Sequence, residues 1–374
     1  MDPSQFISQR SRAVDASGIR KVFDLAVGLK DPINFSIGQP DYDVPDPVKE
    51  AAVAAIREGF NTYTPTQGLQ ALRDAIREEL AEEFGDWPNM VMITSGVSGG
   101  LLLMMMAVLN PGDEVVFADP YFVMYKHLAR LVGAVPVTVP SYPDFAFPAA
   151  GIEKAITPRT KMLLVNSPCN PTGIVYSDAD LQAAADIARR HNLLVASDEI
   201  YEALCYEGLC PSIVSYAPER TILLRGFSKT YGMPGWRMGF AAGPEPILQE
   251  MAKLQQYTFV CAPSFAQKAC LTALETDVSR HVADYRRKRN IAYQTLKQTF
   301  EVVKPTGGFY IFPRVPERFS GGTAFVEQAI ARNVLVIPGN VFSAQDTHFR
   351  ICYATSDEKI KQGCEILCHL AQNG

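Results

Sequence analysis

The stretch TILLRGFSKTYGMPGWRMG, residues 221–239, combines two patterns that together decide how the chain folds. It opens with an apolar run, 221–224, of the kind that forms strands covered on both faces of a sheet. A glycine-rich turn follows at once and carries two cations, Lys229 and Arg237. Either cation alone would suit a solvated loop. Two cations held so close to a strand end raise the question of what this edge of the sheet binds.

Six other short apolar segments share this strand pattern, and helical stretches such as 178–191 lie between many of them. The seven expected strands are Met90–Thr94, Glu114–Ala118, Val135–Val139, Met162–Asn166, Leu193–Ser197, Thr221–Arg225 and Met238–Ala242. Strands that alternate with helices are typical of a parallel sheet with helices on both faces. The sequence therefore predicts an α/β fold whose large domain has a mostly parallel, seven-stranded sheet flanked by helices.

The two ends of the chain differ from this central pattern. Beyond about residue 275 the sequence predicts a long charged helix and then shorter pieces, at 278–300, 308–312, 321–332, 334–337 and 349–353, before a final helix. This change of pattern favours a second, smaller α+β domain built from both chain ends. We expect an N-terminal arm and part of the small domain over 1–44, a large domain over 45–280 and the small C-terminal domain over 281–374.

A helix is expected to begin at Asp46, because aspartate is a favoured N-cap and Pro47 suits the first helical position. The apolar residues that follow recur at helical spacing. We expect one buried face formed by Val48, Ala52, Val53 and Ile56.

Composition and charge exclude several classes of protein. Hydrophobic residues make up 47% and charged residues 20% of the 374 residues, which is typical of a globular enzyme and unlike a disordered chain. A net charge of −5 at pH 7 gives no overall positive field to attract nucleic acid or an anionic membrane. The longest apolar run, 99–109, is too short to span a bilayer, and the N-terminus lacks the apolar core of a secretory signal. We expect a cytoplasmic protein that binds neither nucleic acid nor membrane.

The eight cysteines contain no CxxC pair. Cys364, Cys368 and His369 could share a helix face, but no second pair of metal ligands lies nearby in the sequence. The sequence therefore predicts no metal site, a packed helix face at these residues, and reduced thiols.

Polar side chains follow several of the expected strands, and open parallel sheets bind ligands at the carboxyl ends of their strands. Asn170 follows the fourth strand, Asp198 and Tyr201 follow the fifth, and Lys229 follows the sixth. Small residues at 95–100 follow the first strand and open a helix whose N-terminus suits a phosphate. Each feature alone has an ordinary explanation as a helix cap, a turn or a solvated loop. Those explanations do not account for all of them meeting at one edge.

Pyridoxal 5'-phosphate is a cofactor that needs this set of groups. Its aldehyde forms a Schiff base with a lysine, and its pyridine nitrogen needs a carboxylate to stay protonated. It also needs donors for its phenolate oxygen, an aromatic ring to stack on and an anion site for its phosphate. Lys229 would attach the cofactor covalently, and Arg237 would pair with the phosphate.

The chain also resembles the class I, fold type I aminotransferases, the aspartate aminotransferase superfamily. The motifs that carry the resemblance occur in order over nearly the whole chain: FSIGQPDYDVP (35–45), YTPTQG (63–68), NSPCNPTG (166–173), SDEIY (197–201), GFSKTYGMPGWRMG (226–239) and FRICYATS (349–356). The resemblance implies a homodimer with shared active sites. It also implies ping-pong transfer of an amino group from an L-amino acid to a 2-oxo acid such as 2-oxoglutarate.

The resemblance assigns roles to individual catalytic residues. Lys229 matches the Schiff-base lysine, which also moves the proton between the substrate Cα and the cofactor. Asp198 matches the partner of the pyridine nitrogen. Tyr201 and Asn170 match the residues that donate hydrogen bonds to the phenolate oxygen.

Further positions match the residues that hold the rest of the cofactor. Phe122 matches the aromatic ring over the cofactor, and Tyr121 is the alternative if the register differs by one. The backbone amides of Val97 and Ser98, together with Arg237, match the phosphate site.

The remaining matches concern the partner subunit and the substrate. Tyr63 matches a tyrosine that reaches the phosphate in the neighbouring subunit. Arg350 matches the arginine that clamps the substrate α-carboxylate, a bidentate task that suits a guanidinium. Gly38 would let the neighbouring strand close over that carboxylate, which Asn170 also contacts.

Two departures from the family pattern bear on affinity and specificity. Many relatives have a phosphate-binding serine at the position of Gly226, so cofactor binding should be weaker unless Ser228 or Ser95 compensates. Some relatives that use aspartate have a lysine at the position of Ser98, which grips the distal carboxylate. The serine favours a neutral or aromatic amino donor, although a cation from the partner subunit would reverse this preference.

Other functions remain open at this point. An aspartate aminotransferase or a C–S β-lyase would share Lys229, Asp198 and Arg350, since a fold alone does not decide a reaction. A non-catalytic regulator that senses the cofactor is a more remote alternative. A nicotinamide dehydrogenase is excluded because no strand is followed by GxGxxG.

Overall fold

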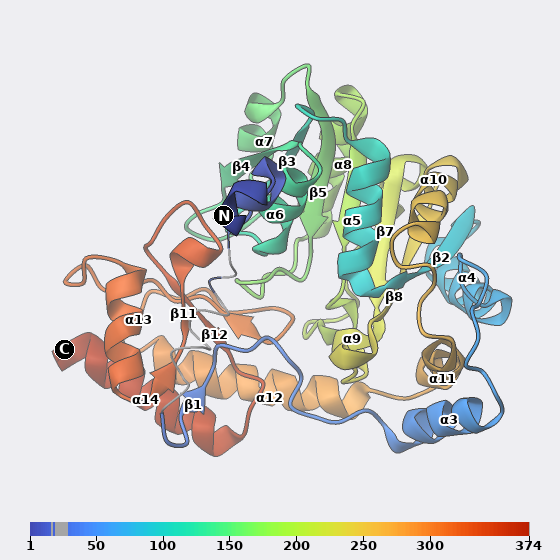
Figure 1. Cartoon of the computed structure of the whole chain (residues 1–374). Coiled ribbons are helices and arrows are strands. Elements are labelled where there is room, and N and C mark those ends of the chain that lie inside the picture. The colour runs from blue at the N-terminus through green and yellow to red at the C-terminus, as the bar shows by residue number, and fades with distance from the viewer. Residues whose placement is uncertain (16–17, 19–28, 374) are drawn as a thin grey trace.

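The structure is a computed structural model that describes residues 1–15, 18 and 29–373. At its centre lies a seven-stranded sheet in the order β2-β8-β7-β6-β5-β3-β4 (Figure 1). Its strands are β2 (Met90–Ser95), β3 (Glu114–Asp119), β4 (Val135–Pro140), β5 (Thr160–Asn166), β6 (Leu194–Asp198), β7 (Thr221–Gly226) and β8 (Met238–Gly243). Only β8 runs antiparallel to its neighbours, β2 and β7. The predicted mostly parallel, seven-stranded sheet is confirmed, with strand ends within one or two residues of those expected.

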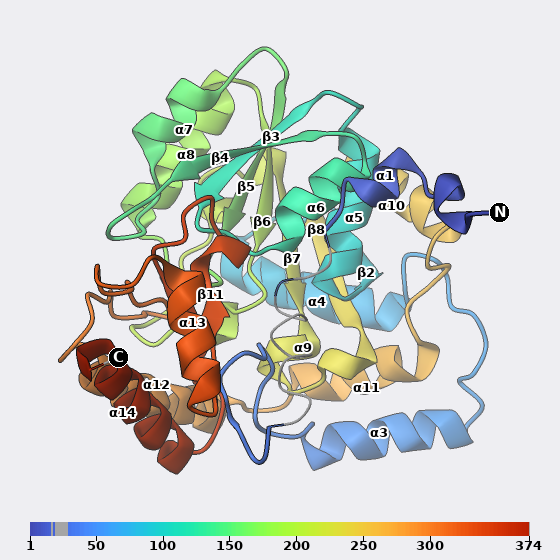
Figure 2. The same ribbon diagram turned by 60° about the vertical axis from the view of Figure 1, so that its left-hand side comes forward.

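Helices cover both faces of the sheet, because side chains along each strand alternate between the faces. Leu164 packs with one set of helices and its neighbour Leu163 with the other. The first face carries α5 (Gly96–Val108), α6 (Met124–Leu131) and α10 (Glu245–Gln256) (Figure 2). The opposite face carries α4 (Gln70–Phe84), α7 (Ala149–Ala155), α8 (Asp178–Arg190) and α11 (Ser264–Leu274), and α3 (Asp46–Arg57) packs on the outside of α11.

Helix α3 begins where the sequence predicts, but two details of that prediction are wrong. Asp46 is the first helical residue rather than the N-cap, and its carboxylate pairs with Lys49 at 2.7 Å. Val53 and Ile56 are 36% and 45% exposed, whereas Ala55 is buried. The helix packs mainly against α11 and lies at the edge of the molecule, so only a narrow stripe of its surface is covered.

The remaining elements gather beside the large sheet and include the helices α12 (Ser279–Leu296), α13 (Gly322–Ala331) and α14 (Asp357–Asn373) (Figure 1). Strand β1 (Ile33–Asn34) pairs in parallel with β10 (Val334–Leu335), which joins the two ends of the chain. Strand β12 (Phe349–Cys352) pairs with β9 (Tyr310–Ile311) and β11 (Ile337–Pro338) in an antiparallel sheet. The expected single piece at 334–337 is therefore wrong: β10 and β11 belong to different sheets, because the chain changes partner at Val336.

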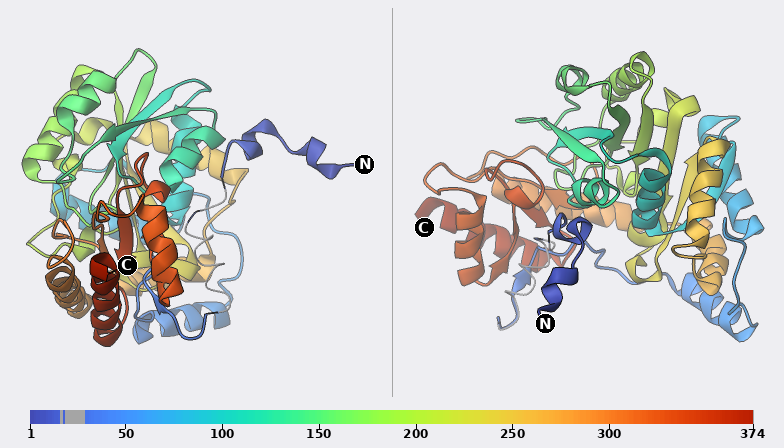
Figure 3. Two further views of the ribbon diagram at one scale, coloured as in Figure 1. Left: turned by 90° about the vertical axis from the view of Figure 1, so that its left-hand side faces the viewer. Right: turned by 45° about the horizontal axis from the view of Figure 1, so that its top comes forward.

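The first residues of the chain, η1 (Pro3–Phe6) and α1 (Gln9–Arg12), project from the rest of the molecule (Figure 3). The predicted boundaries 1–44, 45–280 and 281–374 stay a prediction, and residues 16–17 and 19–28 of the first segment lie outside the described residues. Cys364, Cys368 and His369 all lie on α14, where Cys364 is buried and His369 is exposed. No helix within the described part of the chain has both the length and the apolar character needed to cross a membrane.

Candidate active site

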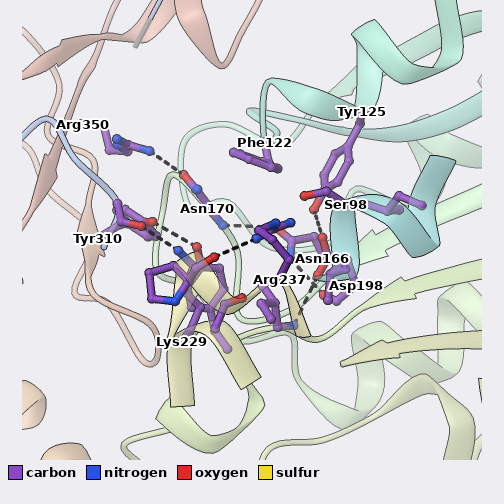
Figure 4. A pocket seen from close by; sticks show the side chains of 17 residues that line it. Ser98, Phe122, Tyr125, Asn166, Asn170, Asp198, Lys229, Arg237, Tyr310 and Arg350 are labelled. Atoms are coloured by element: carbon purple, nitrogen blue, oxygen red, sulfur yellow. Dashed lines mark hydrogen bonds between the residues drawn. The ribbon is translucent and has the colours of Figure 1, made fainter. Parts of the chain in front are cut away.

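A cavity of about 190 Å³ lies at the carboxyl ends of β5, β6 and β7 (Figure 4). Helix α5 closes one side with its N-terminus, and β9, β12 and the segment around Gly38 close the other. The structure brings together every site residue expected from the sequence except Tyr63. The Tyr63 side chain does not line this cavity and is 83% exposed.

Lys229 reaches the cavity from α9 (Phe227–Thr230), the single helical turn that follows β7. Its Nζ donates a 2.7 Å hydrogen bond to the backbone oxygen of Gly38. Burial lowers the pKa of the Lys229 amine to about 8, and the charges of Arg350 and Arg237 act in the same direction. Roughly a tenth of the amine is then neutral at pH 7, against fewer than about one part in a thousand for an ordinary lysine.

Asp198 is the last residue of β6 and is buried at the base of the cavity. Its Oδ2 accepts a 2.7 Å hydrogen bond from the Tyr125 hydroxyl, and its Oδ1 accepts one of 3.3 Å from the backbone N–H of Ile200. Burial raises the pKa of the Asp198 carboxyl to about 6, and no cation among the described residues offsets this effect. The site therefore holds a carboxylate that lacks a positive partner.

The first turn of α5 and the turn before β8 form a positively polarised cradle. Gly239 allows the two backbones to meet, because a Cβ there would lie 2.7 Å from the carbonyl carbon of Gly96 and 2.8 Å from the nitrogen of Val97. Arg237 adopts a left-handed conformation with φ of 58° and donates to the backbone oxygen of Ser95 at 3.3 Å. Free N–H groups at a helix start beside an arginine bind anions such as phosphate.

Gly226 lies close to the backbone of β8. A Cβ on Gly226 would lie 3.1 Å from both the backbone oxygen of Met238 and the Cα of Gly239. Of the two serines expected to compensate, Ser228 is buried and lines the cavity, whereas Ser95 does not line it.

Arg350 projects from β12 and is only 1% exposed. Its guanidinium lies between the rings of Tyr310 and Phe342, 4.7 Å and 4.6 Å from their centres. It donates to Asn170 Oδ1 at 3.1 Å and to the backbone oxygen of Ser36 at 2.5 Å. Its buried Nε has no hydrogen-bond partner among the described residues. A buried cation with an unused donor is costly unless an anion joins it.

Two further contacts and one aromatic ring define the walls of the cavity. Asn170 uses Oδ1 to accept from Arg350, so its Nδ2 remains the donor. The hydroxyls of Tyr201 and Tyr310 lie 3.0 Å apart. Of the two aromatic residues considered for the ring over the cofactor, Phe122 lines the cavity and Tyr121 does not.

Sequence reasoning missed Tyr125, Asn166 and Tyr310. Asn166 ends β5 and donates a 2.9 Å hydrogen bond to the backbone oxygen of Asp198, so its position at a strand end was a usable signal. Tyr125 lies one helical turn after Phe122, which was a weaker signal. Nothing in the sequence singled out Tyr310, whose partner Tyr201 is 109 residues away.

The donor set fits pyridoxal phosphate. The cavity offers a buried amine with a lowered pKa, a carboxylate that lacks a cation, and an anion cradle at a helix start. These match the aldehyde, the protonated ring nitrogen and the phosphate of that cofactor. Asn170 and Tyr201 also line the cavity, with an amide and a hydroxyl that can donate hydrogen bonds.

Comparisons with known proteins identify the family of the chain. Residues 30–367 match the family model described as aminotransferase class I and II. The chain is 38% identical to aromatic-amino-acid aminotransferase 2 of Thermococcus litoralis and 39% identical to aspartate aminotransferase of Pyrococcus abyssi, with 96% of both chains covered in each case. The solved structure of aspartate aminotransferase from Thermus thermophilus with maleate has a TM-score of 0.93 and 35% identity, covering 97% of this chain and 99% of that one.

Fold and site together define a transferase of fold type I that works with pyridoxal phosphate. The chain belongs to the class I and II aminotransferases. It is therefore an enzyme whose substrates are amino acids and oxo acids.

Proposed function

We propose that this aminotransferase takes the amino group from an L-amino acid with a neutral or aromatic side chain and passes it to a 2-oxo acid such as 2-oxoglutarate. The observation that carries this proposal is the charge of the cavity wall. Among the described residues, the lining cations are Lys229, Arg237 and Arg350, and each has another task. Ser98 lines the wall with a hydroxyl, so a distal carboxylate would be buried without a cation.

Arg350 would hold the α-carboxylate of the substrate. The Arg350 Nε has no hydrogen-bond partner within the described part of the chain, and the guanidinium is buried against an aromatic ring. A carboxylate would neutralise this buried charge and would accept two parallel hydrogen bonds from it, which supports the role. Gly38 leaves room beside Arg350, since a Cβ at Gly38 would overlap the Tyr310 hydroxyl.

The bound cofactor supplies an aldehyde that exchanges amino groups and a ring that withdraws electrons from the substrate Cα. Asp198 would keep the proton on the ring nitrogen, because its carboxylate is buried and has no other cation. Tyr201 and Asn170 would donate to the phenolate oxygen. Lys229 Nζ would remove the Cα proton and return it on the cofactor side; its lowered pKa favours the neutral amine that this transfer requires.

The phosphate would bind at the first turn of α5. Val97 and Ser98 offer backbone N–H groups there, Ser228 offers a buried hydroxyl, and Arg237 offers a charge. Phe122 would stack on the ring. Because Ser228 lies at the cavity, we expect it to replace the hydroxyl that Gly226 lacks.

We further propose a homodimer in which Tyr63 completes the phosphate site of the partner subunit. The high exposure of Tyr63 and its place outside its own cavity support this role. A hybrid of a Lys229→Ala subunit and a Tyr63→Ala subunit would contain one site with both residues. Mixing these two impaired variants should therefore restore activity above either alone; no recovery would argue against shared sites.

We also propose a cytoplasmic location, without binding to nucleic acid or membrane. The net charge of −5 and the eight cysteines, all free thiols in the structure, support this proposal.

The proposal on substrate class is tested by adding single amino acids to the cofactor-loaded enzyme and following the loss of its visible absorption. Aromatic and aliphatic amino acids should react faster than aspartate. Ser98→Lys should increase the rate with aspartate relative to phenylalanine. Faster reaction of the unaltered enzyme with aspartate would refute the proposal. Release of pyruvate or ammonia without an added oxo acid would identify a β-lyase instead.

A further inference from the structure

Tyr310 lies where the proposed cofactor and substrate halves of the cavity meet (Figure 4). It projects from β9 and is buried. Its hydroxyl is 3.0 Å from the Tyr201 hydroxyl, and its ring faces the Arg350 guanidinium at 4.7 Å. A single side chain therefore contacts one residue from each half.

Either hydroxyl can donate in this pair, so the direction of the hydrogen bond depends on what Tyr201 does in the cavity. Burial raises the pKa of both phenols, so each keeps its proton at neutral pH. A phenol has one proton to donate. If Tyr201 donates its proton to an anionic oxygen in the cavity, the Tyr201 oxygen can only accept in its hydrogen bond with Tyr310. Tyr310 is then the donor of that bond. The reverse direction would leave Tyr201 with no proton for the cavity.

The ring has a separate task. Arg350 lies between Tyr310 and Phe342, and a guanidinium over the face of a buried aromatic ring is attracted by the ring's quadrupole. This arrangement fixes the plane of the guanidinium. A guanidinium donates two parallel hydrogen bonds to a carboxylate only when the planes of the two groups are aligned.

Few other groups in the described part of the chain act on the Tyr310 phenol. The charged or titratable side chains there that affect its pKa are Arg350 and Cys352 on β12, and Tyr201 beyond the end of β6. The Tyr201 and Tyr310 rings pack edge to face, with their centres 5.7 Å apart and their planes at 89°. This packing keeps the two hydroxyls within hydrogen-bond distance.

We propose that Tyr310 is a positioning residue with two separable tasks: its hydroxyl orients Tyr201 as a donor to the cofactor, and its ring orients Arg350 for the substrate carboxylate. The proposal rests on the proposed roles of Tyr201 and Arg350. The tasks can be separated because Tyr310→Phe removes only the hydroxyl, whereas Tyr310→Leu removes the ring as well.

The test compares these variants in the cofactor-loaded enzyme by two readouts other than turnover. One is the pH midpoint of the cofactor's visible absorption, which reports the proton on the Lys229 nitrogen. The other is the dissociation constant of 3-phenylpropionate, a carboxylate with no amino group to react. Weaker donation to the phenolate oxygen leaves more negative charge beside that nitrogen, which favours its proton and raises the midpoint.

Tyr310→Phe should raise the midpoint by about half a pH unit and change the dissociation constant less than about twofold. Tyr310→Leu should also weaken 3-phenylpropionate binding by about tenfold. The matched control is Tyr353→Phe, because Tyr353 is buried and donates to Gly308 at 3.0 Å but does not line the cavity. It should move neither readout.

A double variant shows whether Tyr310 acts through Tyr201. Tyr201→Phe with Tyr310→Phe should shift the midpoint no further than Tyr201→Phe alone. An unchanged midpoint in Tyr310→Phe, or an additive double shift, would overturn the hydroxyl task. Unchanged binding in Tyr310→Leu would overturn the ring task, and if that variant does not fold, Tyr310→Phe still decides the hydroxyl task. If Tyr201→Phe itself leaves the midpoint unchanged, the proposed role of Tyr201 is wrong.

Discussion

The Tyr125 hydroxyl donates a 2.7 Å hydrogen bond to Oδ2 of Asp198, a buried carboxylate that no cation among the described residues pairs with. The hydroxyl favours the ionised form, but burial outweighs it and raises the pKa of Asp198 to about 6. The fold thus holds a group that is costly to ionise until a positive ligand arrives. Such groups are typical of functional sites.

We predict that Asp198→Asn stabilises the cofactor-free protein at pH 8 by up to roughly 3 kcal/mol and prevents tight binding of the cofactor. A carboxyl whose pKa rises on folding binds more protons in the folded state, so its ionisation opposes folding. The stability difference should therefore grow from about pH 4 to pH 6 and stay constant above. Urea unfolding at several pH values measures it.

The second prediction concerns the rate at which the cofactor joins the protein. Only a neutral amine attacks an aldehyde, and burial lowers the pKa of Lys229 to about 8. The association rate of pyridoxal phosphate should therefore rise with pH and level off above about pH 8, measured by stopped-flow absorption.

Lys229→Ala is the control for that experiment. It should lack, at every pH, the absorption band that the cofactor gains on covalent attachment, and it should show no turnover. Normal transamination by this variant would contradict the assigned role of the lysine, and a rate that still rises steeply above pH 9 would contradict the lowered pKa.

A third prediction separates function from stability at Arg350. Arg350→Met should lower kcat/KM by about 10²–10³-fold, because a charge-assisted bidentate contact is lost. It should not lower the free energy of unfolding, since Arg350 is buried without a carboxylate partner among the described residues.

The matched control is Arg289→Met. Arg289 is also 1% exposed, but it donates to the backbone oxygen of Pro305 and pairs with Glu207. This variant should lose stability, as thermal unfolding would show. Equal destabilisation of both variants would mean that Arg350 is structural rather than held for a ligand.

The fourth prediction concerns Arg225, which is buried behind the site. It pairs with Glu199 at 2.9 Å and with Glu83 at 2.6 Å. Glu199 is held further by the hydroxyls of Ser197 and Ser212. Arg225→Met should lower the free energy of unfolding by about 3–5 kcal/mol, because a buried carboxylate loses its counter-charge.

Glu83→Gln provides the comparison for Arg225. Glu83 is partly exposed, so its loss should cost only about 1 kcal/mol, measured in the same urea titration. A loss of less than 1 kcal/mol in Arg225→Met would show that the network contributes little.

The strands of the large sheet could be predicted because both faces are covered, which requires continuous apolar runs such as 162–166. Parallel strands that end at one edge also made Asn170, Asp198 and Lys229 predictable as neighbours. Exposure on α3 could not be predicted in the same way. Ala55 and Ile56 both fit a helical stripe, and only the position of α11 decides which is covered.

The sequence by itself determined the fold, the cofactor chemistry and the residues that local motifs carry, because strand, turn and cation follow one another along the chain. The tertiary structure alone decided which distant groups support them. Tyr125 meets Asp198 across 73 residues, and Asn170 meets Arg350 across 180. Hydrogen bonds and burial depend on distances in space, which spacing along the chain does not contain, so these partners and their effects on pKa appear only once the chain has folded.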